Sequence, residues 1–216
     1  MLTDTISQDI LCPVSTSDLQ AFVACIDPAQ QPLIASLGQA ATNIIEGYLG
    51  DYVQQRSVRW ILSRGENEKT QAFFASWLSS RSFISYGFNA VAGQWIDFPT
   101  AAQSVENVTL GVWGMDDWPL VMGQDYAVDL MTNPARMSIT YNLAVQDYFT
   151  NFSHLEVDYT GGIAPAGSCP QTIQLAIKIL TKNLFDNRGA SGTVLFDDAI
   201  KGLLVNYRRI GFGGAG

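Results

Sequence analysis

The apolar residues of this 216-residue chain follow two different periods, and the change from one to the other constrains the fold more than any single motif. Near both ends, apolar residues recur every three or four positions, which is the spacing of one face of an α-helix. In the middle they alternate with polar residues, which is the spacing of a half-buried β-strand. The sequence therefore predicts an α+β protein, in which the N- and C-terminal segments form a small helical bundle with an antiparallel β-rich insertion between them.

Two helices are expected in the N-terminal part of the chain. The first lies in VSTSDLQAFVACI, where Ser15 or Ser17 is a suitable N-cap before apolar residues at helical spacing. The second begins near Asp27 and Pro28, runs for about 20 residues or roughly 30 Å, and ends at Gly50. Its apolar residues are expected to form one stripe that faces a core. They are Leu33, Leu37, Ala40, Ala41, Ile44, Ile45, Tyr48 and Leu49.

The middle of the chain contains several short runs of strand character. Period-two alternation predicts strands in RSVRWILS, ARMSITYNL and HLEVDYTGG. Three further candidates are separated by Gly, Pro, Asn and Asp, namely FISYGFNAV, VENVTLGVW and DYAVDL. One stretch, TQAFFASWLSS, is a candidate short helix. We therefore expect an antiparallel β region that is rich in Trp, Tyr and Phe.

The C-terminal part returns to helical spacing. A helix is expected after Pro170, because proline is common in a first helical turn, and its end is expected at Asn187 and Arg188. A last short helix is expected near Asp197 and Asp198, whose charges suit a helix N-terminus. The division that follows assigns residues 1–55 and 161–207 to a helical core, 56–160 to the β-rich insertion, and 208–216 to an extended C-terminal tail.

The composition limits the classes of protein to consider. A hydrophobic content of 47% excludes a generally disordered chain. No apolar run approaches the roughly 20 residues that span a bilayer, and the N-terminus lacks the order of a signal peptide, so a soluble, cytoplasmically folded protein is expected. Cys12, Cys25 and Cys169 match no zinc spacing, which predicts free thiols. The net charge of −8 disfavours sequence-specific binding to nucleic acid and binding to anionic membranes.

Few residues suggest catalysis. The single histidine, His154, has no second histidine to share a zinc site, and the patterns GxSxG, HExxH, CxxC and the Walker loop are absent. A cluster of aspartates is a candidate for cation binding or acid/base work, although adjacent aspartates before Trp-Pro are typical of an exposed turn. These are Asp116, Asp117, Asp125 and Asp129. We expect no catalytic residue, no metal and no cofactor.

Aromatic residues alternate with polar ones throughout the middle of the chain. Such residues suit a carbohydrate-binding or base-stacking platform, but they also fill small β cores and subunit interfaces, which is the interpretation we favour. These aromatic residues include Trp95, Trp113, Trp118, Tyr126 and Tyr148.

Taken in order, the two ends of the chain resemble the head-tail connector (adaptor) proteins of long-tailed bacteriophages. The resemblance is carried by VSTSDLQAFVACID and PLIASLGQAATNIIEGYLGDYV near the N-terminus. It continues in LEVDYTGGIAPAGSCPQTIQLAIKILTKNLFDNRGAS and ends in IKGLLVNYRRIGF. These blocks cover about half of the chain, whereas the middle, from roughly Ser57 to Asn151, has no matching motif.

The resemblance implies a structural virion protein without a catalytic site. Members of that family form a ring, commonly dodecameric, beneath the portal protein in the virion neck and extend the channel through which DNA passes. Expected partners are the portal, neighbouring copies of the chain and a tail-side neck or stopper protein, with no membrane and no sequence-specific DNA contact. About twelve copies at −8 each would carry on the order of a hundred negative charges, which disfavours adhesion of DNA to the channel wall.

The C-terminal residues are the expected docking segment for the portal. Arg208 and Arg209 can make charge-assisted hydrogen bonds to carboxylates of a partner, and Ile210 and Phe212 can enter apolar slots. Tyr207 ends the last predicted helix and completes this candidate site. An unattached, frayed end is the alternative interpretation of the same residues.

Three alternatives to the connector remain at this point. Another neck or tail ring, such as a stopper or a tail terminator, belongs to the same class. A carbohydrate-binding adhesion module would use the aromatic middle, through Trp95 and Trp118. A hydrolase would use His154 together with aspartates.

Overall fold

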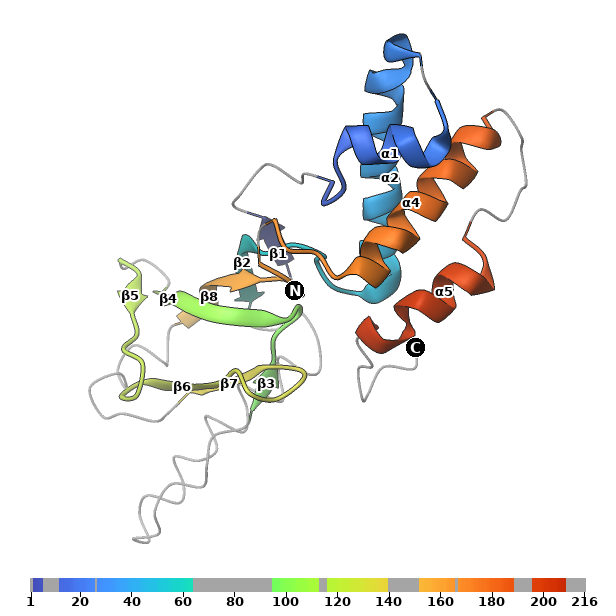
Figure 1. Ribbon diagram of the computed structural model, residues 1–216. Coiled ribbons are helices and arrows are strands. Elements are labelled where there is room, and N and C mark those ends of the chain that lie inside the picture. The colour runs from blue at the N-terminus through green and yellow to red at the C-terminus, as the bar shows by residue number, and fades with distance from the viewer. Residues whose placement is uncertain are drawn as a thin grey trace, which may run out of the picture. The chain divides into compact units, whose positions relative to one another are not determined.

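The computed structural model describes residues 2–5, 12–25, 27–63, 95–112, 116–139, 152–165, 167–188 and 196–208, and it divides into two compact units (Figure 1). The helical unit comprises Ser7–Arg56 and Gly162–Gly216. The sheet unit comprises Met1–Ile6 and Ser57–Gly161. The predicted α+β class is confirmed, with helices contributed by both ends of the chain and antiparallel sheets by the middle.

The helical unit contains α1 (Thr16–Val23), α2 (Gln31–Leu49), α4 (Gln171–Asp186) and α5 (Asp198–Leu204), with short 3-10 turns before α2 (η1, Pro28–Gln30) and after α5 (η4, Val205–Tyr207). The predicted caps are largely confirmed. The Ser15 side chain accepts a hydrogen bond from Asp18 N, the Asp197 side chain accepts one from Ile200 N, and Gly50 closes α2 in the left-handed region.

The core of the helical unit joins the N- and C-terminal segments. Leu19 of α1 and Ile34 and Ile45 of α2 are buried together with Ile177 of α4 and Leu204 of α5. Neither segment has an apolar face that could be buried within that segment alone. The bundle is therefore held together by contacts between parts of the chain that lie far apart in sequence.

The apolar stripe that the sequence predicts on α2 is present, but only one side of it is buried in the helical core. Ala41, Ile45 and Leu49 are buried, and Ile34, which the prediction omitted, is buried with them. The other apolar residues recur at i, i+4, i+7 and i+11 and lie roughly a third of a turn away from the buried face. We call them the outer stripe: Leu33, Leu37, Ala40 and Ile44.

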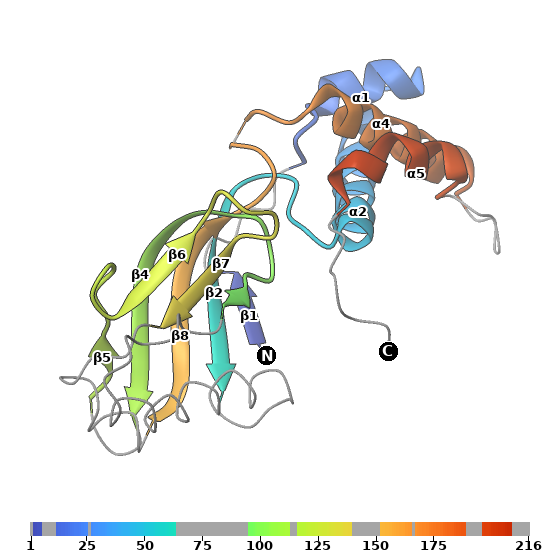
Figure 2. The ribbon, with the colours of Figure 1, turned by 90° about the horizontal axis from the view of Figure 1, so that it is seen from below.

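The sheet unit consists of a five-stranded sheet in the order β1-β2-β8-β4-β5 and a three-stranded sheet in the order β3-β7-β6, which lie as two layers (Figure 2). The first sheet contains β1 (Leu2–Thr5), β2 (Arg56–Ser63), β4 (Ala102–Val112), β5 (Trp118–Pro119) and β8 (Phe152–Gly161). The second contains β3 (Ile96–Asp97), β6 (Tyr126–Asp129) and β7 (Arg136–Ile139).

A cluster of aromatic rings fills the space between the two layers. Phe98, which follows β3, lies 5.5 Å from the Trp60 ring and 5.0 Å from the Tyr159 ring, between centroids, and all three side chains are fully buried. Tyr159 OH is also hydrogen-bonded to Thr100 Oγ1 at 2.7 Å. These described aromatic residues of the middle therefore form a core, in line with the interpretation favoured above.

The first residues of the chain differ from expectation. Residues 1–55 were assigned to the helical core, but β1 pairs with β2 in antiparallel register, Leu2 opposite Ile61 and Thr5 opposite Val58. A strand of four residues is too short to show a period, so nothing in its pattern links it to the middle of the chain. The helix expected in TQAFFASWLSS, the strand in FISYGFNAV and the end of ARMSITYNL lie outside the described residues.

Candidate functional site

Two of the five predicted docking residues, Tyr207 and Arg208, are described by the structure, and they lie at the C-terminal end of the helical unit. Tyr207 ends η4 and packs partly buried against the core. The guanidinium carbon of Arg208 lies 5.2 Å from the centroid of the Tyr48 ring, close to the end of α2. This is a cation–π contact of an exposed arginine, which contributes about 0.5–1 kcal/mol. Arg209, Ile210 and Phe212 lie outside the described residues.

Two chain segments leave the helical unit side by side, and we call them the crossover pair: residues 51–56 and 162–164. Gln55 N donates a hydrogen bond to Ala164 O at 2.8 Å, and Ile163 N donates one to Tyr52 O at 2.8 Å. Gly162 has a φ of +140°, and a Cβ at this position would lie 2.6 Å from Gln54 O. The segments approach each other so closely that only glycine fits here.

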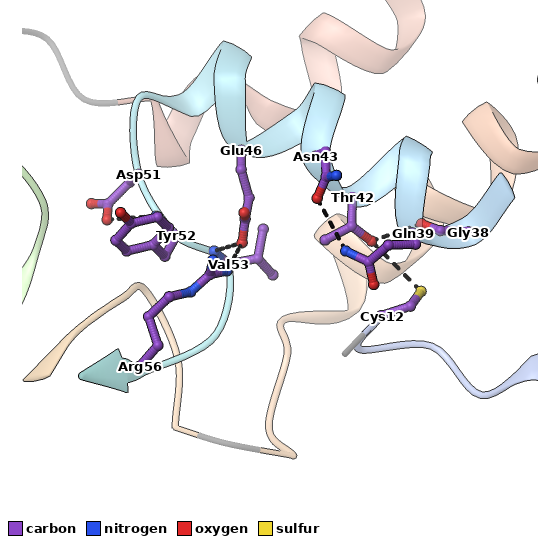
Figure 3. Close-up of polar contacts among 10 residues, drawn as sticks. All are labelled: Cys12, Gly38, Gln39, Thr42, Asn43, Glu46, Asp51, Tyr52, Val53 and Arg56. Carbon is purple, nitrogen blue, oxygen red and sulfur yellow. Dashed lines mark hydrogen bonds and ion pairs between the residues drawn. The ribbon is translucent and has the colours of Figure 1, made fainter. Parts of the chain in front are cut away.

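A mostly buried ion pair ties the crossover pair to α2 (Figure 3). Glu46 Oε1 accepts hydrogen bonds from Arg56 Nη2 and, at 2.9 Å, from Val53 N, and only 11% of its side chain is exposed. The Arg56 guanidinium also lies 4.0 Å from the centroid of the Tyr52 ring. Glu46 thus connects α2 to the residues that lead into β2, through its contacts with Val53 and Arg56.

Burial dominates the electrostatics of this pair. It raises the pKa of Glu46 above its ordinary value of 4.5, although the Val53 N–H and the positive charge of Arg56 act in the opposite direction. Neither Glu46 nor Arg56 is among the residues predicted from the sequence. The available signal was that Glu46 is the only charged residue in the 19 residues of α2, since a lone charge on an otherwise uncharged helix needs a partner.

The structure does not gather the candidate catalytic groups into a site. His154 Nδ1 is hydrogen-bonded to Ser153 Oγ at 2.8 Å, and its ring covers Gly111, where a Cβ would lie 2.1 Å from His154 Cε1. Asp125 accepts a hydrogen bond from Val121 N at 2.8 Å, and this contact closes a turn. Within the described part of the chain, no group of three or more His, Cys, Asp or Glu residues is arranged to hold a metal ion.

The remaining aspartates are also accounted for by local structure. Asp129 pairs with Arg136 at 3.0 Å; desolvation raises the pKa of Asp129, but the hydrogen bonds from Arg136 and from Met131 N outweigh it and hold the pKa below its ordinary value. Asp116 and Asp117 are exposed, as expected for a turn. No acid/base pair emerges from these four residues as the structure describes them.

The predicted aromatic set does not form one exposed surface where it is described. Trp95 is exposed and lies beneath the Arg136 guanidinium, 4.9 Å from the ring centroid. Trp118 is half-buried in the edge strand β5, and Tyr126 is buried, which raises the pKa of its phenol. Trp113 and Tyr148 lie outside the described residues.

The thiols agree with the sequence prediction, since Cys12, Cys25 and Cys169 are all free. Burial, with a smaller contribution from nearby Cys12, raises the pKa of the Cys169 thiol to about 11. A thiol that stays protonated at neutral pH is a poor nucleophile and a poor metal ligand. Cys169 is therefore a core residue of the helical unit.

Charge divides unequally between the two units. The sheet unit contains twelve acidic and five basic residues, a net charge of −7, whereas the helical unit contains eight acidic and seven basic residues, a net charge of −1. On the sheet, Arg59 lies between Glu156 at 3.1 Å and Asp158 at 2.8 Å. The acidic character of the chain is thus a property of the sheet unit.

Among the described residues, no helix has both the length and the apolar character needed to cross a bilayer.

Solved structures of other proteins have folds similar to this one. No family model and no curated protein matches the sequence. A chain in the structure "Virion of native gene transfer agent (GTA) particle" superposes with a TM-score of 0.70 at 13% identity. Chains from "Neck of empty GTA particle computed with C6 symmetry" and "Neck of native GTA particle computed with C12 symmetry" give TM-scores of 0.67 and 0.61 at 13% and 15% identity. Each match covers 100% of this chain and 99% of the other, so the whole fold is shared.

Proposed function

We propose that this protein is a structural component of a virion neck, where it forms a ring beneath the portal that joins the head to the tail. The observation that carries the proposal is the full-length fold match to chains from the necks of phage-like particles. Both units take part in that match, including the sheet unit, for which the sequence offers no family motif. The cyclic symmetry named for those necks is consistent with a ring of identical copies.

The proposed role is structural rather than enzymatic. His154 and the four aspartates have local partners or exposed positions, as described above. The Ser153 hydroxyl lies within hydrogen-bond distance of His154 Nδ1 but also donates to Gly111 O at 3.1 Å, and none of the described carboxylates is paired with His154 to complete a triad. The interior of each unit is filled by apolar and aromatic side chains. Such a chain is suited to assembly, because subunit contacts depend on its surfaces and not on reactive side chains.

We further propose that the C-terminal tail contacts the portal. Arg208, the last described residue, lies over the Tyr48 ring of the helical unit, 5.2 Å from its centroid, and is exposed to a partner. Arg209 supplies a second positive charge, and Ile210 and Phe212 supply apolar groups between glycines. This combination suits an extended segment that lies against another chain and gains charge-assisted hydrogen bonds there.

The division of charge supports a role beside the DNA channel. With a net charge of −7 in the sheet unit, a ring of about twelve copies places on the order of eighty negative charges on its sheet units alone. A strongly negative wall repels the phosphate backbone, and DNA passes without adhering. The tail-side partner in this proposal is another neck or stopper ring.

Imaging of labelled particles tests the proposed function. A fusion or antibody label on this chain is expected at the vertex between portal and tail, and purified chain is expected to bind purified portal. A label on tail fibres together with glycan binding that Trp95→Ala abolishes would instead favour an adhesion module. A label at the far side of the neck would identify a stopper or tail terminator.

A further inference from the structure

From the surface of α2, we infer that the outer stripe is the contact by which one copy of this chain packs against the next copy in the ring. This inference rests on the proposed function and adds the surface and the occupant. Ile44 is 41% exposed, and Leu33, Leu37 and Ala40 are half-buried. The apolar residues of α2 extend over roughly half of its circumference, and the helical core buries only the side that carries Ile34, Ala41 and Ile45.

The absence of charged side chains around the outer stripe indicates that the surface packed against it is apolar. Residues 28–45 contain no Asp, Glu, Lys or Arg, a run of 18 residues that includes most of α2. A surface designed for DNA would present basic residues, and a surface facing only water would contain charged residues. The outer stripe has neither, which fits an apolar protein surface.

The polar groups that border the stripe are satisfied within α2 itself. Ser36 Oγ donates to Leu33 O at 2.7 Å, and Gln39 Nε2 donates to Asn43 Oδ1 at 3.0 Å (Figure 3). These two hydrogen bonds can persist when the stripe is covered, which lowers the cost of desolvating the groups that form them.

The proposed ring of identical copies makes a second copy the occupant, and electrostatic repulsion between copies is smallest at the helical unit. Identical chains repel one another in proportion to the product of their charges, and the sheet unit carries −7 against −1 for the helical unit. Contact through the helical unit therefore brings the least charged surfaces together. In a closed ring each copy offers two different faces to its neighbours, so the stripe of one copy meets another surface of the next.

The inference is tested by self-association of the full chain. Wild-type protein, Leu37→Asp and Ile44→Asp are compared by sedimentation over a range of concentrations, with Val205→Asp as the matched control, because Val205 is an exposed apolar residue of the same unit at 56% exposure. Each stripe variant is expected to weaken association by about tenfold or more, since it buries a charge, whereas the control behaves as wild type. Thermal unfolding of each variant verifies that it is folded.

Two results would overturn the inference: a wild-type chain that stays monomeric at every concentration, or stripe variants that associate as strongly as wild type. Binding of the wild-type chain to purified portal is measured in parallel. If the chain binds portal but the stripe variants associate normally, only this inference fails. If the chain neither associates nor binds portal, the proposed ring fails with it.

Discussion

Gly162 is a position at which the backbone conformation and the neighbouring chain exclude every residue that has a Cβ atom. Its φ of +140° is disfavoured for L-residues, and a Cβ would lie within 2.6 to 2.8 Å of backbone atoms of Gln54 and Gln55. We predict that Gly162→Ala lowers the free energy of unfolding by about 3 kcal/mol or more, because strain adds to backbone overlap. Chemical denaturation monitored by circular dichroism measures this loss.

The matched control is Gly202→Ala in α5, where an added Cβ meets no atom within 4 Å. Alanine is the better helix former, so this variant is expected to gain about 0.5–1 kcal/mol. A Gly162→Ala protein as stable as wild type would show that the crossover pair is less closely packed than described.

Glu46 and Arg56 form a mostly buried ion pair, so a substitution of one residue changes the electrostatic environment of the other. Arg56→Met leaves the Glu46 carboxylate, whose side chain is 11% exposed, without its counter-charge, and we predict a loss of about 3 kcal/mol at neutral pH. Glu46→Gln retains an acceptor for Val53 N and is expected to cost less, because the raised pKa of Glu46 means that folding favours its uncharged form. The double variant Glu46→Gln/Arg56→Met is expected to lose less than the sum of the single variants. Urea denaturation of all four proteins gives the coupling energy.

An exposed ion pair provides the comparison. Lys182 and Asp186 lie 2.8 Å apart on α4 with side chains 45% and 49% exposed, so Lys182→Met is expected to cost at most about 0.5 kcal/mol. Strictly additive losses at Glu46 and Arg56 would show that the two side chains do not stabilise each other.

The pH dependence follows from the raised pKa of Glu46. A carboxyl whose pKa is higher in the folded state contributes stability below its ordinary pKa of 4.5, and that contribution is lost as the pH rises through the folded value. Removing the positive charge in Arg56→Met raises the pKa further. The destabilisation by Arg56→Met is therefore expected to be smaller at about pH 5 than at about pH 8.

At the scale of elements, the helices and long strands follow from the sequence, because their caps and periods are local. Ser15, Gly50 and Asp197 cap helices where the sequence predicts them. Which side of the apolar stripe on α2 is buried does not follow, since Leu37 and Ala41 look alike in a periodic pattern. Which of them is buried depends on where α1 and α4 pack, and that is a tertiary contact.

The candidate site shows the same limit. The sequence indicates that the C-terminal arginines are unusual, and Arg208 does make a contact, but its partner Tyr48 lies 160 residues away. The Glu46–Arg56 pair and the crossover pair likewise depend on backbone placement. β1 joins a sheet whose other strands come from beyond the first two helices, and no local signal specifies that pairing.

The tail is the element whose proposed role is easiest to separate from the fold. Leu204 is fully buried and Tyr207 packs on the core, so the helical unit closes before residue 209. We predict that deleting residues 210–216 leaves the thermal unfolding midpoint within about 2 °C of wild type but weakens portal binding by about tenfold or more. Pull-down and interferometry with purified portal measure the second effect.

A full-length variant with Ile210→Ser and Phe212→Ser is the control for chain length. It is expected to weaken portal binding as the deletion does, because the apolar groups rather than the backbone supply the contact. Unchanged portal binding in both proteins would show that residues 210–216 are an unattached end.

At the scale of the whole molecule, charge is divided more unequally than exposed apolar surface. Exposed apolar residues occur on both units, such as Ile44 on the helical unit and Met122 and Met131 on the sheet unit, whereas the sheet unit carries almost all of the net charge of −8. A ring built from such chains brings many like charges into one particle. Assembly must therefore overcome a repulsion that grows with every copy added and that mobile ions can screen.

Salt should consequently strengthen the association of copies. The Debye length falls from about 30 Å at 0.01 M to about 8 Å at 0.15 M, so repulsion between sheet units weakens over this range while the apolar contact of the outer stripe is unaffected. Sedimentation of the wild-type chain is expected to show tighter association at the higher salt concentration, and Ile44→Asp should stay weak at both. Association that instead weakens as salt is added would mean that attractive ion pairs hold the copies together, and the contact would then have to be sought on charged surfaces away from α2.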